Sequence, residues 1–215
     1  MSAVETAGPV ASVPTRVQVE LFAVSVLSLM VELILIRWAP ATVHIVGFFS
    51  NLVLIAAFLG LGIGLASGGD LGAAIDRAFI RLAIAVGVLG MLSVVRVSLP
   101  KGGDYGINEE AALSLPVSMP MAVVLIVVFA LIAWATIPFG QMVAARFDLL
   151  PRLQAYSINI GGSLVGVVAF SMLGWLQTPA YVWFVIAAAL LWILRRSRAH
   201  VLPAILIMIT LVASH

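Results

Sequence analysis

The sequence predicts an all-α integral membrane protein, a polytopic bundle of about seven transmembrane helices with a cytoplasmic N-terminus. Of its 215 residues, 63% are hydrophobic and only 9% are charged, and the mean hydropathy is +1.22. Soluble domains carry about 25% charged residues, so this chain has too little charge to cover a water-facing surface. Its length accommodates about seven spans at ~20 residues each, joined by short loops.

The distribution of basic residues predicts the orientation. With a cytoplasmic N-terminus, the expected inner segments hold Arg16, Arg77, Arg81, Arg146, Arg152, Arg195, Arg196 and Arg198, and the outer ones hold Arg37, Arg96 and Lys101. This bias obeys the positive-inside rule and places His215 outside. Four aromatic residues fall at the expected outer interface, namely Trp38, Trp175, Tyr181 and Trp183. The net charge of +2 is small, and it gives no reason to expect a nucleic-acid partner.

The chain divides into a mobile tail, residues 1–16, and a single transmembrane domain, residues 17–215. The expected spans are residues 17–39, 43–66, 79–99, 119–139, 155–174, 180–194 and 201–213. A cleaved signal peptide is the alternative for the first apolar run, but that run is longer than the ~7–15 residues of a signal core and contains Glu32. The last span is short and contains Pro203, so it is tilted, crosses partly, or begins a longer element.

Two expected spans carry stripes of small residues. Residues at spacings of three and four share one helical face, and G-x-x-x-G pairs let helices approach closely in lipid. The stripes are Gly162, Gly166 and Ala169, together with Asn159, in span 155–174, and Ala56, Gly60, Gly64 and Gly68 in span 43–66. Both faces are therefore expected to be helix-packing surfaces.

Glu32 is the most informative single residue, because a carboxylate at membrane depth is costly and normally faces the bundle interior. Arg37 is five positions away, about 140° around the helix, so it diverges from Glu32. Folding the first two spans into a hairpin would bring Asn51 to the depth of Glu32, which suggests a Glu32–Asn51 hydrogen bond. The alternatives are an interior but purely structural Glu32, or one that reaches the headgroups.

Other polar residues carry weaker hypotheses. Asn159 is interpreted as a helix–helix contact, with a ligand-binding role as the alternative. His44 is an interface residue or a ligand of a metal or pigment; no metal site or cofactor is expected. There is no cysteine and no nucleotide-binding or zinc-protease motif. The only lysine, Lys101, lies in a loop, which excludes a retinal Schiff base.

A weak internal repeat is visible between Ser50-Asn51 and Ser157-Ile158-Asn159. Each asparagine is followed by a stripe of small residues. One asparagine in each half of a bundle suits a duplicated, transporter-like architecture. Chance similarity is the alternative explanation, since the two matches are short and their spacing differs.

Three segments together resemble the membrane domain of bacterial spermidine synthase-like proteins, in which a multi-span module precedes a soluble aminopropyltransferase-like domain. They are VELILIR (31–37), FLGLGIG (58–64) and AYSINIGGSLVG (155–166). The resemblance covers roughly residues 17–180. It places Glu32, Arg37, Tyr156, Asn159 and Gly162 on the family pattern, and it implies the inner membrane of a bacterium.

The soluble transferase domain is missing from this chain, so the resemblance does not imply aminopropyl transfer, and the chain is not expected to be an enzyme on its own. We expect a non-catalytic membrane module that acts as an anchor or as a subunit binding a protein partner or a small molecule. The first alternative is a transporter-like protein for a small solute, such as a cation, that passes Glu32. The second is an accessory subunit of a respiratory or photosynthetic complex.

Overall fold

The computed structural model describes residues 14–98 and 115–195. Three expectations concern other residues and lie outside that part of the chain. These are the tail before residue 14, most of the loop 101–118, and the last span at 201–213.

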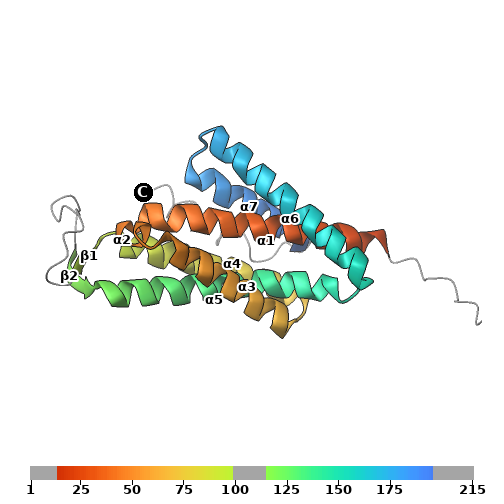
Figure 1. Ribbon diagram of the computed structural model, residues 1–215, viewed down its shortest axis with the longest axis horizontal. Helices are drawn as coiled ribbons and strands as arrows, with labels where there is room; N and C mark the ends of the chain where they lie inside the picture. Colours follow the sequence, from red (N-terminus) through yellow and green to blue (C-terminus); the bar gives the residue numbers. More distant parts are fainter. Residues whose placement is uncertain (1–13, 99–114, 196–215) are drawn as a thin grey trace, which may run out of the picture.

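The described chain is almost entirely helical, as the composition predicts. Its elements are α1 (Thr15–Thr42), α2 (His44–Gly47), α3 (Ser50–Ser67), α4 (Leu71–Leu92), β1 (Val95–Ser98), β2 (Leu115–Pro120), α5 (Met121–Phe147), α6 (Arg152–Trp175) and α7 (Ala180–Arg195). The six long helices alternate in direction along the bundle (Figure 1). The two short strands pair in parallel and were not expected from the sequence.

Three helices are long and apolar enough to cross a membrane, namely α1, α5 and α6. Helices α3 and α7 are also apolar but shorter. Exposed side chains agree with a lipid environment, since Ile126 is 68% exposed and Leu164 is 62% exposed. Apolar side chains exposed in such numbers are expected where acyl chains replace water as the solvent.

Several expected boundaries differ from the ends of the helices. Helix α3 begins at Ser50 and not at residue 43, and α4 ends at Leu92 and not at residue 99. Helix α4 begins at Leu71, not at residue 79, because the Asp70 carboxylate caps it by accepting a hydrogen bond from the Ala73 backbone N–H at 2.9 Å. Arg81 therefore lies near the middle of a helix and not at its inner end. Helix α5 continues through Pro138 to Phe147, where the sequence suggested an end at residue 139.

Helix α1 is the centre of the bundle. It lies between the α6–α7 hairpin and the group formed by α3, α4 and α5 (Figure 1). Its side chains Leu21, Val24, Leu27 and Ile34 are fully buried. Because α1 contacts every other long helix, its sequence decides how the two groups face each other.

Both glycine stripes are packing surfaces, as expected. A methyl group on Gly162 would lie 2.7 Å from the Phe22 carbonyl oxygen of α1, and one on Gly166 would lie 2.6 Å from that of Val26. Helix α3 meets α5 in the same way, where Gly60 and Gly64 face the backbone carbonyls of Ala133 and Ile137. The helices of each pair run parallel to each other, since residue numbers rise together along both contacts.

Gly68 departs from the expected stripe. It lies beyond the end of α3 with a φ of 60°, a left-handed conformation that favours glycine. The α3 packing surface therefore consists of Ala56, Gly60 and Gly64, of which Ala56 is fully buried.

Replacing Gly60 or Gly162 by alanine is expected to destabilise the protein by about 1–3 kcal/mol, because the new methyl group would overlap a facing backbone carbonyl. The matched controls are Gly62→Ala and Gly161→Ala, since nothing lies within 4 Å of a methyl group at either position. Their effect should be neutral or stabilising by up to about 1 kcal/mol from helix propensity. Unfolding by titration with a denaturing detergent measures all four, and equal losses at both kinds of glycine would contradict the packing described.

Candidate functional site: the buried polar residues

Glu32 lies in the bundle interior with 2% of its surface exposed. Neither of its carboxylate oxygens has a hydrogen-bond partner among the described residues. A buried polar group without a partner costs about 1–3 kcal/mol, and an unpaired charge costs more. Glu32 is therefore the most costly polar side chain in the described interior.

The expected Glu32–Asn51 hydrogen bond is absent from the described structure, and Asn51 is exposed. The predicted depth of Asn51 required the first two spans to form a hairpin with its turn near residues 38–44. Instead, α1 continues to Thr42 and the short helix α2 follows before α3 begins. Asn51 is then level with the end of α1, ten residues or about 15 Å along the helix axis from Glu32.

Asn51 belongs to a shallow groove at the end of the bundle where α2 meets α3. The groove has a volume of about 360 Å³, and its other lining residues are Phe48, Phe49, Leu52, Ile55 and Phe129. The neighbouring His44 is exposed. No group of three or more His, Asp or Glu side chains within residues 14–98 and 115–195 is placed to hold a metal ion.

Arg37 diverges from Glu32, as the helical geometry predicts. Its side chain is exposed, and its guanidinium lies over the Trp183 ring of α7, 5.2 Å from the ring centroid. Trp38 packs edge-on against Phe184 beside it, with ring centroids 5.2 Å apart. Arg37 thus fastens α1 to α7 at the aromatic end of the bundle and does not join the buried polar residues.

Two serines lie on the same face of α1 as Glu32. The Ser25 hydroxyl lies 2.8 Å from both the Leu21 carbonyl oxygen and Asn159 Oδ1 of α6, so it donates to one of them at a time. The Ser28 hydroxyl lies 3.5 Å from the Phe139 carbonyl oxygen of α5. The Asn159 contact agrees with the expected helix–helix role for that residue.

Helices α3 and α5 also exchange polar contacts. The Thr136 hydroxyl lies 3.2 Å from the Ala57 carbonyl oxygen, and Gln141 Nε2 donates to the Ser67 hydroxyl at 3.1 Å. The Gln141 amide oxygen has no partner among the described residues. These contacts reinforce the glycine-mediated approach of the same two helices.

Arg81 is a polar residue of the helix middle whose place the sequence did not predict. Its Nη1 donates to the Trp134 carbonyl oxygen at 3.1 Å, and its guanidinium lies over the Trp134 ring, 4.9 Å from the centroid. Within α5, that carbonyl would normally accept from residue 138, but Pro138 has no N–H. Arg81 therefore satisfies a backbone carbonyl that the proline leaves free.

Glu20 is a second residue whose contacts the sequence analysis missed. One of its oxygens accepts from Arg16 at 2.8 Å, and the other accepts from Arg146 of α5 at 2.7 Å. The i,i+4 spacing to Arg16 was a readable signal, whereas the approach of Arg146 depends on α5 continuing past residue 139. At the same end of the bundle, Arg195 of α7 pairs with Asp76 of α4.

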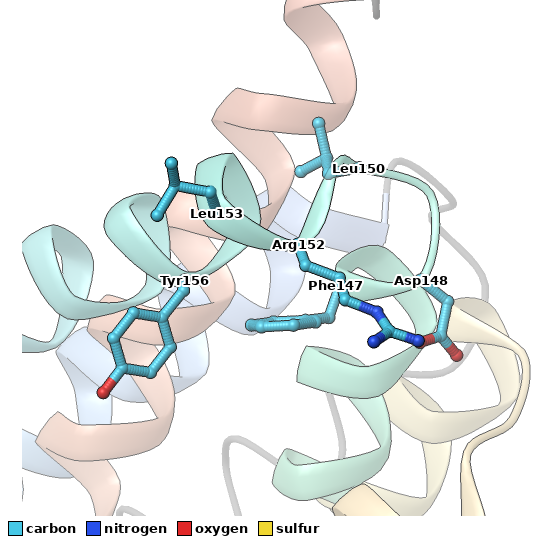
Figure 2. Close-up of a pocket in the computed structure, with 6 residues that line it drawn as sticks. All are labelled: Phe147, Asp148, Leu150, Arg152, Leu153 and Tyr156. Atoms are coloured by element: carbon cyan, nitrogen blue, oxygen red, sulfur yellow. The ribbon is translucent and has the colours of Figure 1, made fainter.

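Tyr156 is exposed and lines a groove where α5 joins α6 (Figure 2). The groove has a volume of about 650 Å³, and its other lining residues are Phe147, Asp148, Leu150, Arg152 and Leu153. In Figure 2, Arg152 points toward Asp148 while Tyr156 points away from both. The groove has apolar walls, one acidic residue, Asp148, and one basic residue, Arg152. It opens at the surface, toward the end of the bundle where α1 begins, and is separate from Glu32.

Replacing each of the two glutamates of α1 by leucine is expected to have opposite effects. Glu32→Leu removes a buried polar group without a partner, so it should stabilise the protein by about 1–3 kcal/mol. Glu20→Leu removes two part-exposed ion pairs and should destabilise by about 1 kcal/mol. Detergent-induced unfolding compares the two variants, and a loss of stability in Glu32→Leu would show that the carboxyl has a structural partner.

The chain was compared with protein-family models, with curated proteins and with solved structures, and none of them matches. The described chain has three features that bear on function. They are a helical bundle with three helices long and apolar enough to cross a membrane, a buried glutamate without a partner among the described residues, and a surface groove between α5 and α6.

Proposed function

We propose that this chain is a non-catalytic, multi-pass module of a bacterial inner membrane that serves as an anchor or as a subunit binding a protein partner or a small molecule. One observation carries the proposal. Most of the described buried polar side chains form helix–helix contacts, as Ser25, Thr136 and Gln141 do, and none of these three lines either of the two grooves described above. This arrangement supports assembly and binding rather than a reaction carried out within the bundle.

The resemblance to the membrane domain of spermidine synthase-like proteins remains part of the proposal. Of the residues on that pattern, Asn159 and Gly162 contact α1, whereas Tyr156 lines the surface groove. A protein partner such as a separate transferase-like subunit would approach from the aqueous side. The groove between α5 and α6 offers such a partner both charged and apolar residues.

A cytoplasmic N-terminus is the proposed orientation, with seven spans if residues 201–213 also cross. The basic residues at the α1 N-terminal end of the bundle include Arg16, Arg77, Arg146, Arg152 and Arg195. Arg37 lies at the opposite end. Because Arg81 lies in the middle of a helix, it no longer counts among the basic residues of the inner segments. The excess of basic residues remains on the same side without it.

Single cysteines test the orientation directly, because the chain has no cysteine of its own. Pro179→Cys lies before α7, and Leu149→Cys lies in the turn before α6, so the two flank one crossing helix. In intact cells, a membrane-impermeant maleimide is expected to label position 179 at once and position 149 only after permeabilisation. The reverse pattern would show that the N-terminus is outside. Labelling of both positions in intact cells would show that α6 does not cross the membrane.

Transport of a small solute, such as a cation, is the second candidate function, and one observation favours it. Glu32 keeps a carboxyl in the interior without a described partner, and ionisable residues within membrane helices normally mark solute or proton pathways. An accessory role in a respiratory or photosynthetic complex is the third candidate. The exposed apolar face of α6, which includes Leu164 and Met172, supports it only as a surface that other helices could cover.

Two measurements separate these candidates. Native mass spectrometry after mild detergent extraction is expected to show the chain bound to a partner protein or a small molecule, whereas a lone 22.7 kDa species would argue against the first and third candidates. Uptake of labelled polyamines into vesicles tests the second. Transport past Glu32 predicts at least tenfold lower flux in Glu32→Gln than in the native protein, and equal flux would dismiss it.

A further inference from the structure

The two parallel helix pairs of the bundle are built alike. Helix α3 crosses α5 through Gly60 and Gly64, and α6 crosses α1 through Gly162 and Gly166. The two glycine pairs correspond with a constant offset, since 162 minus 60 and 166 minus 64 both equal 102. The offset alone relates two G-x-x-x-G motifs, which are common in membrane helices.

The surfaces that these glycines meet correspond as well. The first glycine of each pair faces Ala133 on α5 or Phe22 on α1, and the second faces Ile137 or Val26. Here 133 minus 22 and 137 minus 26 both equal 111. The residues of α5 that contact α3 therefore correspond one to one, at this constant offset, with the residues of α1 that contact α6.

The hydroxyl contacts fit the same two offsets. Thr136 of α5 reaches Ala57 of α3 at 3.2 Å, and Ser25 of α1 reaches Asn159 of α6 at 2.8 Å. Here 136 minus 25 equals 111, and 159 minus 57 equals 102. This register replaces the one suggested by the sequence, in which Asn51 corresponded to Asn159.

The contact between Ser28 and Phe139 locates the symmetry axis. Under the second offset Ser28 corresponds to Phe139, because 139 minus 28 equals 111, so the contact between them maps onto itself. Helices α1 and α5 run in opposite directions, as do α3 and α6, and α4 and α7 (Figure 1). A two-fold axis perpendicular to the helices and passing between Ser28 and Phe139 accounts for all of these relations.

We infer that α1, α3 and α4 form one half of an inverted repeat, that α5, α6 and α7 form the other, and that Glu32 beside the axis binds a proton taken from and returned to either side of the membrane. The inference deepens the second candidate function and rests on it. In each half, the helix hairpin packs on the long helix of the other half, α3–α4 on α5 and α6–α7 on α1. Ion sites of inverted-repeat transporters lie near the bilayer midplane at the repeat interface.

Glu32 is placed at that interface. It follows Ser28 by four residues, one helical turn along the same face of α1, so it lies about 6 Å from the axis along the helix. It is buried, and its carboxylate has no described partner. Val143 is the corresponding residue of α5 under the same offset, since 143 minus 32 equals 111, so the symmetry-related position carries no carboxyl.

The surroundings of Glu32 favour a proton over a metal cation. Hard cations such as Ca²⁺ take six to eight oxygen ligands, and no group of three or more His, Asp or Glu side chains in the described part of the chain is placed to hold a metal ion. A proton needs only the carboxylate itself. Binding forms one O–H bond and gives the neutral acid that an apolar interior accepts, and release breaks that bond and returns the proton to water.

The other charged groups near this level are engaged elsewhere or lie toward the ends of the bundle. Arg81 of α4 is held by the Trp134 carbonyl, and Arg37 of α1 lies over Trp183. The remaining titratable groups of the helices around α1 are His44 on α2, Asp76 and Arg77 on α4, Arg146 on α5, Arg152 and Tyr156 on α6, and Tyr181 and Arg195 on α7. None of them is bonded to Glu32 in the described structure.

Dicyclohexylcarbodiimide tests the inference, because this apolar reagent adds to protonated carboxyls within membranes. The carboxyl oxygen bonds to the carbodiimide carbon and its proton passes to a nitrogen, so the adduct keeps all atoms of both reactants. The reagent is applied to membrane vesicles of one orientation that contain the full chain, under three conditions. In the first the buffer is acidic inside and alkaline outside, in the second it is alkaline inside and acidic outside, and in the third it is alkaline on both sides. Peptide mass mapping then locates the adduct.

Modification of Glu32 is expected in both asymmetric conditions and should fall roughly tenfold for each pH unit when both sides are alkaline. Glu32→Gln should abolish this adduct, and Glu20→Gln, a matched change on the same helix, should leave it unchanged. Modification under only one of the two gradients would overturn access from both sides, and none in any condition would overturn the proton site. Cysteine labelling at positions 149 and 179 is independent of Glu32, so it shows separately whether the membrane topology fails.

Discussion

The close approach of parallel helices through glycine is the constraint on which the rest of the structure depends. Lipid provides no hydrophobic driving force between apolar helices, so van der Waals contact and a few hydrogen bonds must hold the bundle together. At Gly60 and Gly162 the backbone of one helix lies against a carbonyl of its neighbour. That proximity also brings Ser25 to Asn159 and Thr136 to Ala57, so the polar contacts follow from the glycine contacts.

Glu32 differs from the other interior polar residues because no described contact compensates its burial. Ser25 and Thr136 are one or two bonds away from the backbone and find a carbonyl of their own helix at position i−4. The Glu32 carboxylate needs hydrogen-bond donors, and no donor among the described residues reaches it. An unsatisfied group of this kind in a well-packed interior is where function is most reasonably sought.

The sequence predicted the helical class, the apolar helices and both glycine surfaces, because these depend on composition and on spacing within one helix. It failed where geometry between helices decides. The Glu32–Asn51 pairing required the hairpin turn, and the added helix α2 changed the depth of Asn51. The early start of α4 was readable from Asp70 as an N-cap residue, but the expected span was placed at residue 79, where a more apolar run begins. The partners of Arg146 and Arg81 could not be predicted without knowing which helices are neighbours.

Pro138 weakens α5 near its middle, because proline has no backbone N–H and one backbone hydrogen bond of the helix is therefore missing. Arg81 of α4 donates to the carbonyl oxygen that is left without this bond. Bending of α5 at this point would stretch or release the guanidinium, and α4 would have to follow. The two helices, which also pack directly against each other, therefore share this contact at the proline.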